Sequence, residues 1–170
     1  MGIILVAALV LSSWYAASQY LQQLYPTSTS SQSNSSIDVL FNYGNGSTPW
    51  FNSTLVHRGA SFYNVTVSLT RGRLEAKYYD QYHEHLVSSI NGVKNGATSY
   101  WQIWIYCTRD RAWMYSSWGV DALKPTNQGL SIDNSVGHQV IMSSNALAWS
   151  YQASSDNPPV SGAPKVDLCS

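Results

Sequence analysis

The sequence carries little charge, and none at its start. Nine Lys and Arg side chains balance nine Asp and Glu among 170 residues, so the net charge is zero. A nucleic-acid-binding domain shows a basic patch or stripe, and this balance excludes that class. The first charged side chain is Asp38. The charge-free residues 1–37 are therefore the first part of the sequence that needs an explanation.

Signatures of common catalytic and cofactor sites are also missing. The sequence contains no G-x-S-x-G elbow, no Walker or Rossmann glycine pattern and no C-x-x-C pair. His83-Glu84-His85 is the one cluster that suggests a metal, which needs three or four converging ligands. In a strand, Glu84 would point away from the two histidines. We interpret the histidines as solvated, and we expect a non-enzymatic protein without metal or cofactor.

Cysteine is scarce, with only Cys107 and Cys169. The low charge and the apolar N-terminus favour an extracytoplasmic location, where a disulfide persists. We predict a Cys107–Cys169 disulfide that ties an extended C-terminal tail, residues 153–170, to the domain. Two buried free thiols are the alternative.

An unbroken apolar run occupies residues 1–11 and predicts a helix over residues 1–25. Pro26 ends this helix, because proline lacks the N–H that a helix requires. At about 1.5 Å per residue the helix would span roughly 37 Å, more than the ~30 Å hydrocarbon core of a bilayer. Ser and Gln side chains in its second half indicate that the later turns pack against protein.

Two roles for this helix stay open. As a membrane anchor it would place Trp14, Tyr15 and Tyr20 near a lipid interface. As an assembly helix it would resemble that of type IV pilin-like subunits, which bundles with copies of itself in a filament core. A cleaved signal is disfavoured because no basic side chain precedes the run, and a buried helix of a soluble protein has no obvious core to enter. The expected partners are the membrane, copies of this chain, or other membrane and surface subunits.

Residues 26–36 form a Ser- and Thr-rich linker with too few apolar side chains for a core. Four N-x-[ST] sequons lie in this linker and just after it, at Asn34, Asn45, Asn52 and Asn64. In a chain with an export-type N-terminus they predict a glycosylated outer surface. The alternative is that Asn and Ser are simply frequent here.

Residues 37–152 form one domain of short strands separated by turn signals. Residues 60–70 match both helical and strand periodicity. Residues 119–137 are predicted to be an irregular loop, and residues 138–142 and 146–152 to be the last hairpin. The other predicted strands are residues 37–43, 50–57, 74–80, 83–90, 100–108 and 112–118.

The strongest strand prediction covers residues 100–108. Its aromatic and β-branched content suits a central position in a sheet. Alternation places one set of side chains on one face, Trp101, Ile103, Ile105 and Cys107. It places the other set on the opposite face, Tyr100, Gln102, Trp104 and Tyr106.

Several short motifs occur in a recognisable order: Ser89-Ile-Asn-Gly-Val93, Tyr100-Trp101, Gly119-Val-Asp-Ala122 and Trp149-Ser-Tyr151. This order resembles the small β-grasp-like domain at the C-terminus of transcobalamin-type proteins, which also occurs in many archaeal and bacterial surface proteins. The resemblance covers residues 37–152 and implies a helix at residues 60–70. It implies a binding or adhesion domain, sometimes contacting a corrinoid, and no catalysis. The long loop at residues 123–137 departs from the pattern.

Aromatic side chains make up 13 % of the chain. Trp50, Trp113, Tyr115 and Trp118 are candidates for an interaction surface, because aromatic residues are enriched at interfaces. Burial of all four in the core is the alternative.

Together these features predict an α+β class, with an N-terminal hydrophobic helix followed by a mainly antiparallel β-grasp-like domain. The expected role is a non-enzymatic cell-surface glycoprotein subunit with an extracellular interaction module. One alternative is a pilin-like structural subunit of a filament. Another is a tethered module that binds a corrinoid or a glycan.

Overall fold

The computed structural model describes residues 34–134, 137–141, 144–153, 157–167 and 169. The chain divides into two units, Met1–Gln32 and Ser33–Ser170, and every described residue belongs to the second. The predictions for residues 1–25 and for most of the linker lie outside the described residues. Among those described, no helix has the length and hydropathy needed to cross a bilayer.

The described domain is mainly β, which corrects the predicted α+β class. Strands account for 48 % of the structure and helix for 7 %. The helix is α2 (Phe62–Leu69). The strands are β1 (Ser35–Asn42), β2 (Trp50–Val56), β3 (Leu74–Tyr79), β4 (Glu84–Ile90), β5 (Val93–Lys94), β6 (Tyr100–Cys107), β7 (Ala112–Tyr115), β8 (Leu123–Thr126), β9 (Gly129–Asn134), β10 (Gly137–Ile141) and β11 (Ala146–Gln152).

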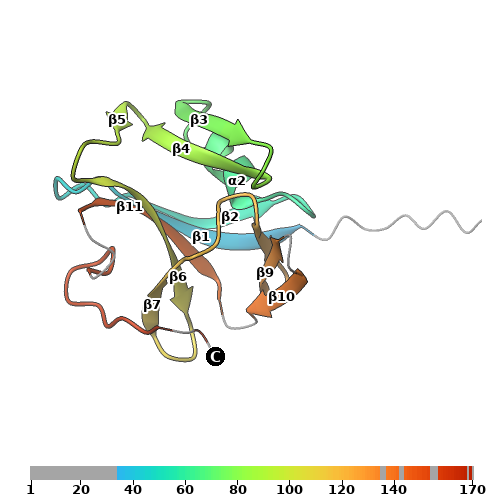
Figure 1. Ribbon diagram of the computed structural model, residues 1–170. Coiled ribbons are helices and arrows are strands. Elements are labelled where there is room, and N and C mark those ends of the chain that lie inside the picture. The colour runs from blue at the N-terminus through green and yellow to red at the C-terminus, as the bar shows by residue number, and fades with distance from the viewer. Residues whose placement is uncertain (1–33, 135–136, 142–143, 154–156, 168, 170) are drawn as a thin grey trace, which may run out of the picture. The chain divides into compact units, whose positions relative to one another are not determined.

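A five-stranded sheet in the order β2-β1-β11-β6-β7 forms the centre of the domain (Figure 1). β1 and β11 are parallel, and the other neighbours are antiparallel. Two smaller sheets, β3-β4-β5 and β10-β9-β8, complete the fold. The turn between β4 and β5 is the predicted Asn91-Gly92, whose φ angles of 50° and 86° suit a two-residue hairpin.

Side chains are buried on both faces of the main sheet. On the first face, Trp101, Ile105 and Trp149 belong to a core cluster that includes Phe62 and Val65 of α2. On the second face, Leu40, Trp104, Trp113, Ala146 and Ala148 form a smaller cluster. The predicted alternation of residues 100–108 is therefore confirmed, since Trp104 lies on the face opposite Trp101 and Ile105.

Within residues 60–70 the helix α2 forms over Phe62–Leu69, because Ser61 and Asn64 cap its start. The Ser61 hydroxyl accepts the Asn64 N–H, and the Asn64 side chain accepts the Ser61 N–H, which is a capping box. Phe62 stacks on the Trp149 indole, and that indole N–H donates to the Thr66 hydroxyl at 2.8 Å. The cap starts the helix, and this contact fixes it on the first face of the sheet.

Two predictions about the C-terminal third are wrong. Residues 119–137 are not an irregular loop, because β8 and β9 pair as a hairpin within them. Pro125 is tolerated in β8 because this is an edge strand of its sheet. The predicted last hairpin does not form either, since β10 pairs with β9 while β11 pairs with β1 and β6.

The predicted disulfide between Cys107 and Cys169 is present, with Cα atoms 5.5 Å apart. The tail that it ties down runs past the open side of β7. The Trp113 N–H donates to the Pro164 carbonyl, and the Val166 N–H donates to the Trp113 carbonyl, both at 3.1 Å. Ala163 packs against the second-face cluster. The tail is thus an integral part of the domain.

Candidate functional site

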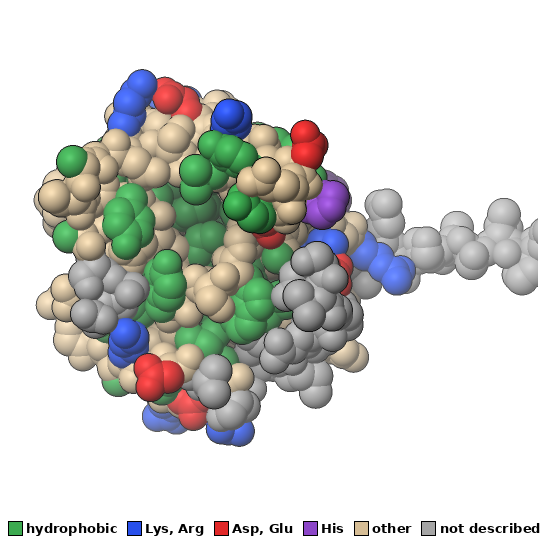
Figure 2. Space-filling model, viewed as in Figure 1, with side chains coloured by type: hydrophobic (Ala, Val, Ile, Leu, Met, Phe, Trp, Pro, Cys, Tyr) green, Lys and Arg blue, Asp and Glu red, His purple; other side chains and the backbone are tan. Residues whose placement is uncertain are grey.

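A hollow with aromatic walls opens on the first face, between β4 and β6 (Figure 2). We call it the aromatic hollow. Its volume is about 240 Å³, and none of its described lining residues is Asp, Glu, Lys or Arg. The apolar side chains of the lining come from β4, β6, β11 and the segment that follows β7: Leu86, Val87, Trp101, Ile103, Trp118, Val120 and Trp149. Tyr115 borders the hollow at the end of β7, but its ring packs on Trp104 of the second face.

One wall of the aromatic hollow is the β7–β8 loop, residues 116–122. Its start is fixed by the Ser116 N–H, which donates to the Ile103 carbonyl at 2.9 Å. Its end is held by the Glu84 carboxylate, which accepts the N–H groups of Asp121 and Ala122 at 2.8 and 3.0 Å. The backbone of the loop is therefore tied to β6 on one side and to β4 on the other.

Glu84 fits against the loop because residue 119 is glycine. A side-chain carbon at Gly119 would collide with the Glu84 carboxylate. Partial burial, followed by the nearby Asp121 carboxylate, raises the pKa of Glu84, and the two backbone N–H bonds offset only part of that effect. This glutamate is therefore held where its charged form is disfavoured.

His85 continues the same contact. Asp121 accepts the His85 backbone N–H at 2.6 Å, and its carboxylate lies 2.9 Å from the His85 ring nitrogen. The ring stacks on Tyr63 with centroids 3.7 Å apart. His83 is exposed, as the sequence interpretation expects, whereas the His85 side chain is only 23 % exposed and is not a solvated histidine.

A second hollow of about 680 Å³ lies on the other side of the loop and shares Ser117, Trp118 and Gly119 with the first. We call it the polar hollow. Its remaining lining is Tyr78, Tyr82, His83, Glu84, Asp121, Ala122, Lys124 and Asp133. Lys124 and Asp133 pair at 2.6 Å. The β7–β8 loop therefore separates an uncharged hollow from a charged one.

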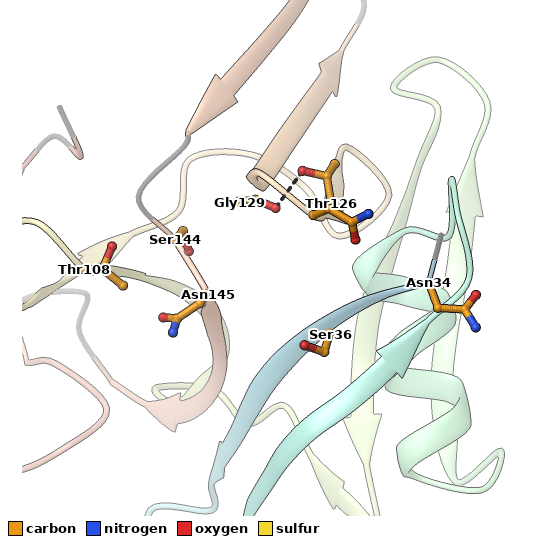
Figure 3. A pocket seen from close by; sticks show the side chains of 8 residues that line it. Asn34, Ser36, Thr108, Thr126, Gly129, Ser144 and Asn145 are labelled. Carbon is orange, nitrogen blue, oxygen red and sulfur yellow. Dashed lines mark hydrogen bonds between the residues drawn. The ribbon is translucent and has the colours of Figure 1, made fainter. Parts of the chain in front are cut away.

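A third hollow, of about 450 Å³, is lined only by uncharged polar residues and glycine (Figure 3). The Thr126 hydroxyl donates to the Gly129 carbonyl at 3.0 Å, and the Asn34 amide points away from Thr108 and Asn145. With neither charge nor aromatic surface, it offers less recognition chemistry than the aromatic hollow.

The predicted interaction residues do not gather in one place. Trp50 is 44 % exposed and its ring contacts Trp113, which is only 3 % exposed and belongs to the second-face cluster. Tyr115 is 38 % exposed and its ring packs edge-on against Trp104 on the second face, so of the four residues half-buried Trp118 is the one that belongs to the aromatic hollow. The sequence analysis did not single out Leu86, which is 60 % exposed at the same hollow.

All four sequon asparagines are exposed. Asn34 precedes β1, Asn45 lies in the β1–β2 turn, Asn52 lies on β2, and Asn64 lies in the first turn of α2. None of them lies on β4, β6, β7 or the β7–β8 loop, the elements that carry the rim of the aromatic hollow.

Among the described residues, the only grouping with three metal-ligand side chains in reach of one another is Cys107, Asp110 and Cys169. Both sulfur atoms are bonded to each other, so this grouping offers one carboxylate only. No known protein family and no curated protein matches the sequence. The functional argument therefore rests on the geometry.

Proposed function

We propose that this chain is a non-enzymatic, extracytoplasmic surface subunit whose β domain docks an apolar side chain of a neighbouring protein subunit in the aromatic hollow. Residues 1–25 hold the chain in a membrane or in a helical assembly. The observation that carries the docking role is a partly open aromatic hollow whose described lining includes no Asp, Glu, Lys or Arg.

The chemistry of the rim supports a protein neighbour. Leu86 is exposed beside half-buried Trp118, and aromatic and aliphatic anchors in desolvated pockets dominate protein interfaces. A saccharide would need several hydrogen-bonding groups inside the hollow. Of the polar residues that line the hollow, the Ser116 hydroxyl is bonded to the Trp118 carbonyl, the His85 ring to Asp121 and the Gln102 amide to Gln152, which leaves Ser117. An apolar side chain suits the site better than a glycan.

The positions of the sequons also support docking at the aromatic hollow. Glycans on Asn34, Asn45, Asn52 and Asn64 would cover the β1–β2 hairpin and the start of α2. They would leave the face formed by β4, β6 and β7 uncovered. A surface subunit whose glycans cover one side and leave the aromatic hollow uncovered is suited to contact a neighbour at that hollow.

The docking test compares two exposed leucines. Leu86→Glu places a charge at the hollow, and Leu55→Glu places the same charge on β2, where leucine is 74 % exposed. The size of the native assembly, measured by sedimentation of material from cells, is expected to fall with Leu86→Glu and to stay unchanged with Leu55→Glu. Equal effects of the two changes would contradict the proposed docking face.

The role of residues 1–25 is tested on the wild-type chain. Material sheared from cells without detergent is examined by negative-stain electron microscopy. Filaments that contain the chain would identify copies of itself as the neighbour. A chain that stays with membranes and needs detergent would identify residues 1–25 as an anchor beside a different subunit. A chain released into solution without either would contradict the surface-subunit proposal.

A further inference from the structure

The β7–β8 loop is attached to β4 through two carboxylates, that of Glu84 on β4 and that of Asp121 on the loop, which accepts the His85 backbone N–H. The Glu84 carboxylate accepts the backbone N–H groups of Asp121 and Ala122 and lies against Gly119. Trp118 precedes these bonded residues in the same loop and lines both the aromatic and the polar hollow. The charge state of Glu84 therefore acts on the attachment of a loop that shapes both sites.

The surroundings of Glu84 decide which charge state favours the attached loop. Partial burial, then the adjacent Asp121 carboxylate, raises the pKa of Glu84 above its ordinary value. Asp121 also faces His85, whose ring is stacked on Tyr63 and contacts the tilted ring of Tyr78. The other titratable or charged groups around the polar hollow are Tyr82, His83, Lys124 and Asp133.

A group whose pKa is raised by a structure binds its proton more tightly in that structure than in water. Acidification therefore stabilises the attached loop. As the pH rises through the raised pKa, this contribution is lost, because a carboxylate must then be kept partly desolvated next to Asp121. This pH dependence is opposite to that of an ordinary salt bridge, which acid weakens.

We propose that Glu84 is a proton-linked latch, which fastens the β7–β8 loop in acid and loosens it as the pH rises. Its relevance to docking rests on the proposed function, since the loop is a wall of the aromatic hollow. The hollow is complete when the latch is fastened, so a neighbour is bound more tightly at acidic pH. The latch itself is a property of the isolated chain.

The test is amide hydrogen exchange of residues 117–122 in the full chain, corrected for the intrinsic effect of pH on exchange. Protection is expected to rise severalfold between mildly alkaline and mildly acidic pH. Glu84→Gln keeps the shape without the titration, and it is expected to remove most of this pH dependence. His85→Phe retains a ring against Tyr63 but cannot titrate, and it is expected to keep the dependence.

Glu75→Gln is the matched control, because Glu75 lies on the same small sheet but is exposed and paired with Lys94. It is expected to behave as wild type. A flat wild-type profile, or a Glu84→Gln chain that keeps the dependence, would overturn the latch. Hydrogen exchange is measured without any partner, so a failed latch test does not affect the docking proposal. A failed Leu86→Glu test likewise does not affect the latch.

Discussion

The C-terminal tail and the β7–β8 loop are attached to the main sheet by different means. The tail runs along the edge of β7, where backbone hydrogen bonds to Trp113 hold it, and Ala163 of the tail packs on the second face. Its end is fixed by the Cys107–Cys169 disulfide, which lies at the first-face cluster, whereas the β7–β8 loop has no covalent link of its own. The loop in particular is attached through hydrogen bonds to Glu84 and to β6.

Because of this difference, we expect the tail to be held firmly and the β7–β8 loop to be able to move. The disulfide ties the tail covalently to β6, so the tail stays in place as long as the disulfide is intact. The β7–β8 loop is attached to β4 by hydrogen bonds that involve the Glu84 and Asp121 carboxylates, so it is free to respond to protons or to a neighbour. The aromatic hollow is bordered by this loop, and a binding surface benefits from a movable wall.

The largest expected effect is at the centre of the first face. Trp149→Ala removes the stack on Phe62 and leaves the Thr66 hydroxyl without the indole N–H, so the free energy of unfolding should fall by about 3–5 kcal/mol. Urea denaturation measures this. Trp149→Phe keeps a ring against Phe62 and should lose clearly less. A loss as small for Ala as for Phe would mean that α2 contributes little to this face.

Breaking the covalent cover should have the next largest effect. Cys169→Ser opens a link between residues 62 positions apart, and an effect of about 2–4 kcal/mol on the free energy of unfolding is expected. Wild-type protein in a reducing buffer should match the variant in urea denaturation. An unchanged midpoint in both would show that the hydrogen bonds from Trp113 hold the tail by themselves.

Local patterns predicted much of this fold, because their causes are local. Alternation in residues 100–108 follows from strand geometry, and the Asn91-Gly92 turn follows from two residues that tolerate positive φ. The ambiguous segment at residues 60–70 was decided by the capping box at Ser61 and Asn64, which the sequence displays.

Distant pairings were not visible in the sequence. β11 lies beside β1 in parallel although more than a hundred residues separate them, and all residues from Ala146 to Ser150 are buried. A strand covered on both faces loses the alternation that marks a hairpin strand. The Glu84 latch is hidden for the same reason, since Asp121 is 37 positions away and its contact is to backbone N–H groups.

A smaller effect is expected where the loop meets Glu84. Gly119→Ala adds a methyl group against the carboxylate and should lower the free energy of unfolding by about 1–3 kcal/mol. Glu84→Ala makes room for that methyl group, so the double variant should lose less than the sum of the single changes. Strict additivity in chemical denaturation would show that the loop yields elsewhere and that Glu84 does not fix it.

The smallest effect on stability is expected at the rim of the aromatic hollow. Leu86 is 60 % exposed, so Leu86→Glu should change the free energy of unfolding by no more than about 0.5 kcal/mol. Leu55→Glu on β2 should be equally mild. Because the same Leu86 change is expected to disrupt the native assembly, a normal denaturation midpoint together with a smaller assembly would assign its effect to docking. A destabilised Leu86→Glu chain would instead place Leu86 in the packing of the first face, and a smaller assembly would then follow from lost stability and not from lost docking.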